Sequence, residues 1–398
     1  MPPVSPTVRT WIDVPNFFDD GLVAFAEALL ARTHVDDARL DGLETVGPRL
    51  AELGYFGVVA PGRPSGDHGV PHVAAGGRGA RVSVRALCLA REVLAYVSPM
   101  ADSVFAVQGL GSYAVLATDS VHDREAFLAK VATGASIGGF ALTEPEAGSD
   151  VASMRTTARA EGDAWVLDGE KVFISNVGIA HHFVVFANAD PSLGKKGISA
   201  FLVPAKTEGL FLQPMRAGGD HPIGRMVFKG ARVAKSALIG NVGDGLRLGL
   251  GTLDVYRTSV GAAAVGMAQR ALDESLRRVT TRVQFGKPLA EFQLTQAALA
   301  DMATELAAAR LLVTRAAWKK DHGTALPEDV AMAKMYATEA AQRIIDRAVQ
   351  LHGGLGVTEG FVTERLYRDV RALRIYEGTT EIQKLIIGGA LTKPKPAS

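Results

Sequence analysis

The sequence predicts a mostly helical α+β fold, because helical periodicity fills both ends of the chain and short alternating runs fill the middle. We expect an N-terminal helical domain over residues 1–135, a small middle β-barrel or sandwich domain over 136–240, and a C-terminal four-helix bundle over 241–398. A length of 398 residues supports this division, since a single hydrophobic core stops growing at roughly 250 to 300 residues.

In the first segment, apolar residues recur three and four apart from about Asp19 to Ala132, which is typical of helices. The widest break runs from Pro61 to Gly79 and is rich in Gly and Pro. It carries His68 and His72, but the glycine and proline between them oppose a helix. We therefore expect a long loop there and no metal site.

The middle segment contains β-rich runs at 137–143, 156–160, 165–167, 183–188 and 198–203, separated by glycine turns. Beyond Gly245 the pattern returns to long helices, which we expect at 246–279, 291–320 and 327–353, with a shorter one from about Thr380. Four helices with few strong breakers indicate a bundle.

The bulk charge argues against two classes of partner. The 43 Lys and Arg residues nearly cancel the 42 Asp and Glu residues, so the chain offers no single-sign field for nucleic acid or an anionic membrane. The single cysteine, Cys88, excludes an internal disulfide. No leader pattern and no run of roughly 20 apolar residues is present, so a cytoplasmic protein is expected.

Two short segments can carry chemistry. After a predicted strand, Thr143 can bond the edge of a heteroaromatic ring, while Gly148 and Ser149 can reach a phosphate. The alternative is an ordinary Gly-Ser-Asp turn. Far downstream, Glu377 lies in Ile-Tyr-Glu-Gly-Thr-Thr, where helical periodicity pauses. A surface glutamate in a turn is the alternative for this residue.

Together, two segments resemble the signatures of the acyl-CoA dehydrogenase family: Ala141-Leu-Thr-Glu-Pro-Glu-Ala-Gly-Ser-Asp150 and Ile375-Tyr-Glu-Gly-Thr-Thr380. The resemblance covers nearly the whole chain and is weakest at 61–80. It implies the acyl-CoA dehydrogenase-like fold and FAD as cofactor. It assigns the following residues to the flavin and its pyrophosphate: Phe140, Leu142, Thr143, Gly148 and Ser149.

Three further segments resemble cofactor-binding parts of the family. The Lys171–Asn176 strand is similar to the family strand that covers the other flavin face, with Phe173 where Trp is common; the alternative is that Phe173 is only strand core. The Arg282–Gln293 loop resembles one that reaches the dinucleotide of a neighbouring subunit; the alternative is that Arg282 is a surface charge. Gln350–Val357 resembles a second family signature, and the alternative is a helix C-cap. The residues implied here are Phe173, Ser175, Arg282, Phe285, Gln293, Gln350, Gly353 and Gly354. The resemblance also assigns Thr379 and Glu381, in and just after the Ile375–Thr380 segment, to the cofactor.

The implied reaction is the conversion of an acyl-CoA to a trans-2-enoyl-CoA, in which Glu377 removes the α proton, flavin N5 accepts the β hydride and electron-transfer flavoprotein receives the electrons. The resemblance assigns substrate contacts to Ser149, Asp254, Arg257 and Gly378, and implies a homotetramer or homodimer. Two rivals stay open. One is an oxidase or oxygenase, or an enzyme of carrier-protein thioesters. The other is a flavin-bearing DNA-associated protein without turnover, which the near-zero charge opposes.

Overall fold

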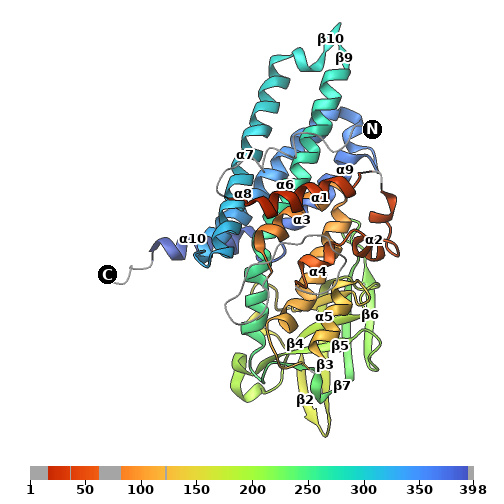
Figure 1. The fold of residues 1–398 in the computed structure, drawn as a ribbon, viewed down its shortest axis with the longest axis vertical. Helices are drawn as coiled ribbons and strands as arrows, with labels where there is room; N and C mark the ends of the chain where they lie inside the picture. The colour runs from red at the N-terminus through yellow and green to blue at the C-terminus, as the bar shows by residue number, and fades with distance from the viewer. Residues whose placement is uncertain (1–16, 36, 62–81, 122, 393–398) are drawn as a thin grey trace. The chain divides into compact units, whose positions relative to one another are not determined.

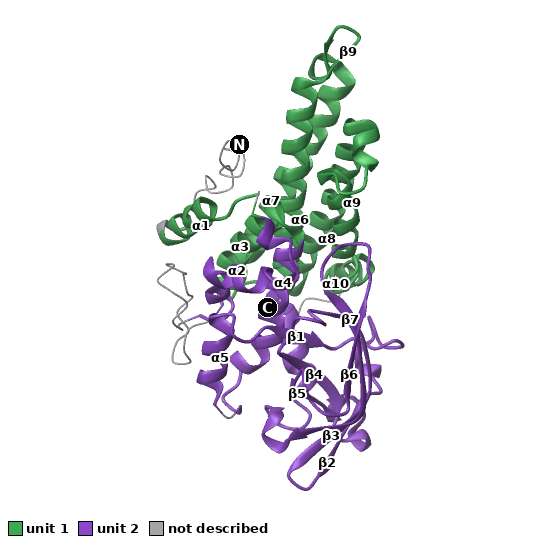
Figure 2. Cartoon of the chain, turned by 90° about the vertical axis from the view of Figure 1, so that its right-hand side faces the viewer, with its two compact units in different colours: residues 1–37, 83–99, 257–398 green, residues 38–82, 100–256 purple. Residues whose placement is uncertain are grey.

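The computed structural model describes residues 17–35, 37–61, 82–121 and 123–392. The predicted loop at 61–79, with His68 and His72, lies almost entirely outside them. The chain forms two compact units (Figure 2): unit 1 comprises 1–37, 83–99 and 257–398, and unit 2 comprises 38–82 and 100–256. The three-domain division at 135 and 240 stays a prediction.

Unit 2 is built around one mixed sheet. Its strands are β1 (Gly138–Ala141), β2 (Thr157–Glu161), β3 (Ala164–Ser175), β4 (His182–Asn188), β5 (Ile198–Pro204), β6 (Leu210–Met215), β7 (Ile223–Ala234) and β8 (Leu238–Ile239). They pair in the order β6-β7-β3-β2-β4-β5-β8, with β1 parallel to β4. The pairing path has two ends among the described strands, so the barrel closure we expected is not observed.

Strands β4 and β5 are buried on both faces, which explains their nearly continuous apolar sequences. Successive side chains of a strand point to opposite faces. Phe183 and Val185 accordingly join a core with Trp165 and Phe201, whereas Val184 and Phe186 join a second core with residues of the covering helices. The sheet is therefore the central layer of this unit.

The helices of unit 2 are α2 (Val46–Glu52), α4 (Pro99–Leu116), α5 (Arg124–Ala132) and the first turns of α6 (Gly245–Thr281). Helix α4 lies directly on β1, because a Cβ added to Gly111 would come within 2.7 Å of the Gly139 nitrogen. The Gln108 amide oxygen also accepts a hydrogen bond from the Gly138 nitrogen at 2.7 Å. These contacts fix the strand that leads into the Phe140–Thr143 segment.

Unit 1 is a helical bundle (Figure 1). Its helices are α1 (Asp20–Arg32), α3 (Val84–Val97), α6 from Arg257 onward, α7 (Gln293–Asp321), α8 (Pro327–His352), α9 (Val362–Leu373) and α10 (Thr380–Thr392). Helix α7 contacts α8 most extensively, and α8 also contacts α9 and α10. Among the described helices of the chain, we find none that combines the length and apolar character required to cross a membrane.

A buried polar chain ties α3 to α6 and α7. Arg310 donates two hydrogen bonds to Glu92, at 3.0 and 2.9 Å, and a third to Gln269 at 3.0 Å. Asp273 then accepts from Gln269 and from the Tyr96 hydroxyl, both at 2.9 Å. Buried charges are tolerated only when paired in this way, so the network specifies how these helices meet.

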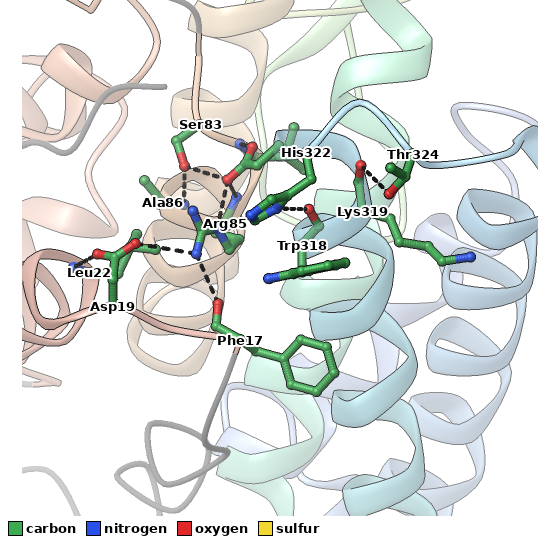
Figure 3. Close-up of polar contacts among 12 residues, drawn as sticks. Phe17, Asp19, Leu22, Ser83, Arg85, Ala86, Trp318, Lys319, His322 and Thr324 are labelled. Carbon is green, nitrogen blue, oxygen red and sulfur yellow. Dashed lines mark hydrogen bonds and ion pairs between the residues drawn. The ribbon is translucent and has the colours of Figure 1, made fainter. Parts of the chain in front are cut away.

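A second polar cluster joins the start of α1 and the start of α3 to the end of α7 (Figure 3). The Asp321 carboxylate accepts from the Ser83 hydroxyl at 2.9 Å, the Val84 nitrogen at 2.7 Å and Arg85 Nε at 2.8 Å. Arg85 also donates to the Phe17 carbonyl at 3.0 Å. An anion at a helix N-terminus satisfies exposed N–H groups, so Asp321 caps α3 from another helix.

The predicted fold class is confirmed by these elements, with two omissions. Sequence reasoning missed β6 and β7, although β7 is twelve residues long, because its glycines and charges interrupt the alternating pattern. It also missed α9, where five charged residues among twelve obscure the apolar face. Burial of Leu366, Val370 and Leu373 at helical spacing shows that this face exists.

Candidate active site

In unit 2, the predicted flavin-binding segment runs along a sheet strand and leaves it at Leu142. Ala141 and Leu142 are buried, Thr143 is half-buried, and Gly148 and Ser149 are exposed. The loop folds back on itself, since Glu144 and Ala147 exchange two backbone hydrogen bonds at 3.1 and 3.2 Å. The segment therefore presents the side chain of Thr143 and the backbone around Gly148 at the edge of a rigid turn.

The Lys171–Ser175 strand lies beside this segment, as the resemblance requires. The Val172 nitrogen donates to the Thr143 carbonyl at 3.0 Å. The buried Lys171 ammonium donates to the Leu142 carbonyl at 3.1 Å and to the Glu144 carboxylate at 2.8 Å. Glu144 also accepts from the Arg155 and Thr156 nitrogens at 2.6 and 3.0 Å. One buried ion pair thus fixes both predicted flavin-facing segments.

The charges of this pair depend on each other. Burial lowers the pKa of Lys171 to about 8, against the opposing attraction of Glu144. Burial raises the pKa of Glu144, but the Lys171 charge and the two backbone N–H groups outweigh burial and hold it below its usual value. Both groups are therefore ionised at neutral pH.

Phe173 lies in the same strand but points away from the core. Its φ angle is +58° and its side chain is 63% exposed, where the pairing of β3 with β7 shifts register between Lys171 and Ile174. A positive φ costs free energy in a bulky residue. The strand-core interpretation of Phe173 is consequently wrong, whereas Ile174, which is 2% exposed, is core.

In unit 1, the Arg282–Gln293 loop forms a hairpin at the join of α6 and α7. Its strands are β9 (Val283–Gln284) and β10 (Lys287–Pro288), connected through Phe285 and Gly286 at φ +50° and +79°. Two positive φ angles are typical of a tight type I′ turn. Phe285 is 93% exposed at the tip. Figures 1 and 2 both show this hairpin at the end of the bundle remote from α10.

The Gln350–Gly354 segment ends α8. Gly353 is the C-cap residue, with a φ of +60°, so the C-cap interpretation holds. A Cβ added to Gly353 or Gly354 would meet no atom within 4 Å, which leaves space beside the backbone. Because α8 runs antiparallel to α7, this segment lies toward the hairpin end of the bundle and away from the start of α8.

Glu377 lies in a turn between α9 and α10, so the predicted pause in helical periodicity is confirmed. Its φ is +53°, and Gly378 follows at +93°. Both ends of the turn are fixed by one carboxylate of α8: Glu339 accepts from Arg374 Nε at 2.8 Å and from the Thr380 hydroxyl at 2.7 Å. Glu377 therefore lies in a turn, as the alternative interpretation also required, but in one that is held at both ends.

The carbonyl groups of the turn are held by donors from three helices. Arg257 Nε donates to the Glu377 carbonyl at 3.0 Å. The buried Lys334 ammonium and the Gln383 amide both donate to the Gly378 carbonyl, at 2.8 and 2.9 Å. Because side chains of α6, α8 and α10 hold both carbonyl groups, the backbone of the turn has a defined conformation at Glu377. Arg257, predicted to contact substrate, here positions the turn.

Four further predicted residues lie on β3, on α6, just before α10 and in its first turn. In unit 2, Ser175 ends β3 and Asp254 lies on α6, both half-buried. In unit 1, the Thr379 hydroxyl accepts from the Ile382 nitrogen at 3.3 Å, and Glu381 is exposed in the first turn of α10. A hydrogen bond of its own backbone N–H, together with the Thr379 hydroxyl, lowers the pKa of Glu381.

Backbone strain coincides with the predicted site. Five non-glycine residues of the described chain have positive φ: Asp123, Phe173, Asn176, Phe285 and Glu377. Three of them, Phe173, Phe285 and Glu377, were selected from sequence as cofactor or catalytic residues. Strained conformations cluster where function fixes a side chain. Within unit 2, the exposed ring of Phe173 and the open space beside Gly148 fit a flat ring system with phosphates, as in FAD.

Sequence reasoning missed Lys334 and gave no role to Lys171 or Glu144. Lys334 lies within a stripe of buried alanines at helical spacing, Ala331, Ala337 and Ala341. A lysine in the middle of an apolar stripe is unusual because burying its charge is costly. That contrast was visible in the sequence, but its partner on a turn forty-four residues later was not.

Comparison with known proteins agrees with this geometry. The family model described as acyl-CoA dehydrogenase, middle domain, matches residues 139–231, and the one described as acyl-CoA dehydrogenase, C-terminal domain, matches residues 243–392. The human mitochondrial short-chain specific acyl-CoA dehydrogenase is 43% identical over 282 residues, covering 70% of this chain and 68% of that protein.

Two further relatives extend the match over almost the whole chain. Subunit CarC of the caffeyl-CoA reductase-Etf complex of Acetobacterium woodii is 36% identical over 382 residues, covering 93% of this chain and 96% of that protein. The crystal structure of a glutaryl-CoA dehydrogenase from Mycobacterium smegmatis in complex with FADH2 has a TM-score of 0.82 and 28% identity, covering 96% and 97%. The chain therefore belongs to the acyl-CoA dehydrogenase family, whose flavoprotein oxidoreductases act on CH–CH groups.

Proposed function

We propose that this enzyme carries out FAD-dependent α,β-dehydrogenation of an acyl-CoA thioester, with Glu377 as the base that removes the α proton. The observation that supports Glu377 is its turn, in which a strained backbone is held by Arg257, Lys334 and Gln383. A protein maintains strain of this kind where a side chain must keep one orientation. The carboxylate thereby meets the first requirement of a general base, a fixed position.

In unit 2, the residues that would hold FAD are those of the two segments joined by Lys171 and Glu144: Thr143 would bond the ring edge, Phe173 would cover its face and Ser149 would bond the pyrophosphate. In unit 1, Arg282 of the hairpin would reach the FAD of a neighbouring subunit, as the resemblance implies. When bound, FAD supplies a hydride acceptor at N5 for the β carbon.

The chain's own contribution to the chemistry is proton removal and charge stabilisation. The α proton of a thioester becomes acidic when donors stabilise the oxygen of the developing enolate. We assign one such donor to the backbone N–H of Glu377 itself. A positioned base of this kind contributes about a hundred- to ten-thousandfold in rate. Asp254 and Arg257 are proposed to contact the thioester side of CoA.

The test is the Glu377→Gln variant, which removes the base but keeps the size of the side chain. We expect the purified variant to bind FAD and remain yellow, yet to be bleached by acyl-CoA at least a hundredfold more slowly than wild type under nitrogen. Glu208→Gln, at an exposed turn before β6, is the matched control and should bleach normally. Normal bleaching by Glu377→Gln would refute the assignment.

Electron-transfer flavoprotein is the proposed electron acceptor. The support is the relative CarC, whose name places it in an Etf complex. That relative is named as part of a reductase complex, and the same base can return a proton when the reaction runs backward. Titrating the purified protein with a panel of acyl-CoAs, and the reduced protein with enoyl-CoAs, would define the substrate and the direction.

The alternative is an oxidase or oxygenase, or an enzyme of carrier-protein thioesters. Phe173 favours it, because a phenyl ring lacks the indole N–H of the Trp common at this position and is 63% exposed. Oxygen consumption upon addition of substrate, compared with dye reduction under nitrogen, separates the two. Rapid oxygen uptake without dye would support the alternative.

A further inference from the structure

Lys334 carries a buried positive charge that the folding of the bundle does not require. Its side chain is completely buried on α8, and its flanking residues on the same face are Ala331, Ala337 and Thr338. Isolated buried charges are strongly destabilising. A methionine would fill the same volume without that penalty, so the ammonium group requires another reason.

The contacts of Lys334 point to the catalytic turn. Its Nζ donates to the Gly378 carbonyl at 2.8 Å, which lies one residue beyond the proposed base. Burial lowers the pKa of Lys334 to about 8, and the positive charge of Arg257 lowers it further. The negative charge of Glu377 raises the pKa most, and those of Glu339 and Glu381 raise it less. The ammonium therefore remains protonated at neutral pH, bound to the residue that follows Glu377.

The other two carboxylates are less suited to be its counter-ion. Glu339 is already bound by Arg374 and Thr380 at 2.8 and 2.7 Å, and Glu381 is exposed to solvent. Charge attraction is reciprocal: a carboxylate that favours the ammonium is itself favoured in its ionised form by the same interaction.

We propose that Lys334 is a positioning residue for the base: its ammonium holds the Gly378 carbonyl and keeps Glu377 ionised in the empty enzyme. This inference rests on the proposed role of Glu377. It assigns Lys334 two effects, a hydrogen bond that fixes the turn and a positive charge that sets the pH range in which the base is active.

Gln383 provides a matched control, because its amide donates to the same carbonyl oxygen at 2.9 Å and carries no charge. Lys334→Met removes the hydrogen bond and the charge, Lys334→Gln removes the charge but keeps a donor, and Gln383→Met removes a hydrogen bond alone. The rate of anaerobic flavin bleaching by acyl-CoA is measured for each from pH 5.5 to pH 9.

We expect the acidic limb of this profile to move upward by about 1 pH unit in both Lys334 variants, since loss of a nearby opposite charge favours the protonated carboxyl. Gln383→Met should keep the wild-type limb, even if its rate falls. If all three variants keep the wild-type limb, or if Gln383→Met moves it equally, Lys334 acts as a structural donor alone and the inference is overturned.

A second measurement does not depend on turnover. In a double-mutant cycle of Lys334→Met and Glu377→Gln, followed by urea unfolding, the loss of stability from Lys334→Met should be smaller when Glu377 is already neutral. Additive losses would show that the two charges are not coupled and would overturn the inference. A wild-type chain that no acyl-CoA bleaches would instead refute the proposed function, whatever the cycle shows.

Discussion

Replacing Lys171 by methionine tests whether the buried ion pair fixes the flavin-facing segments. The change removes a completely buried ammonium that donates to Glu144 at 2.8 Å and to the Leu142 carbonyl at 3.1 Å. Methionine fills a similar volume, so no large cavity is expected. Glu144 then remains as a buried carboxylate without its cation.

The expected loss can be worked out from these contacts. Removing one partner of a buried pair costs about 3 to 5 kcal/mol. Glu144 keeps two backbone donors, at 2.6 and 3.0 Å, so the lower end of about 3 kcal/mol applies. When Glu144 is replaced by Gln beforehand, Lys171 has already lost its counter-charge and its removal leaves no carboxylate unpaired, so the same change should cost at most about 1 kcal/mol, for the lost hydrogen bond to Leu142. The coupling is therefore at least about 2 kcal/mol.

Urea unfolding of the four proteins of this cycle measures the coupling at pH 7, where Lys171 is protonated. Trp165 lies in the core of the sheet and reports the unfolding of unit 2 by its fluorescence, provided that Trp11 and Trp318 are replaced by Phe in all four proteins. A coupling within about 0.5 kcal/mol of zero, the usual error of additivity, would refute the reasoning.

Two further predictions concern stability. Burial lowers the pKa of His182 from 6.5 to about 4, so the unfolded chain binds a proton below pH 6.5 that the folded chain refuses until about pH 4. Up to about 3 kcal/mol of stability is present above pH 6.5 and lost as pH falls through this window; urea midpoints at pH 7 and 4.5 should show it, and His182→Asn should flatten the difference. A Cβ added to Gly266 would lie 2.2 Å from the Glu92 carbonyl oxygen of α3, so Gly266→Ala should lose about 1 to 3 kcal/mol. Gly388→Ala, in α10 with open space around it, should lose nothing in thermal unfolding; equal melting temperatures for the two variants would contradict the steric argument.

Local sequence patterns predicted most elements, because each pattern records which face of an element is buried. The apolar, β-rich run in His182–Asn188 and the helical spacing in Gln293–Asp321 and Pro327–His352 predicted a strand and helices close to those observed. The pattern failed at Ile223–Ala234 and at Val362–Leu373. In the first segment, glycines and charges interrupt the alternation, and in the second, five charged residues among twelve obscure the apolar face.

The site residues were proposed from the sequence for a different reason. Thr143 and Glu377 lie in short segments whose residues are dictated by chemistry, so the segments resemble a family wherever they occur. The substrate contact of Arg257 stays a prediction, and the structure adds a contact that the sequence did not indicate: its Nε donates to the Glu377 carbonyl. A side chain of that length can reach several partners, and spacing along a helix does not select among them.

By itself the sequence determined the family, the succession of helical and β segments, and the identity of the residues proposed to act on substrate and flavin, since these depend on neighbouring positions along the chain. The tertiary structure decided what supports them. Lys334 and Gly378 are forty-four residues apart, and Lys171 and Glu144 are twenty-seven apart. Such partners are recognisable only after folding has brought them into a water-free interior, where a charge needs a counter-charge or a carbonyl.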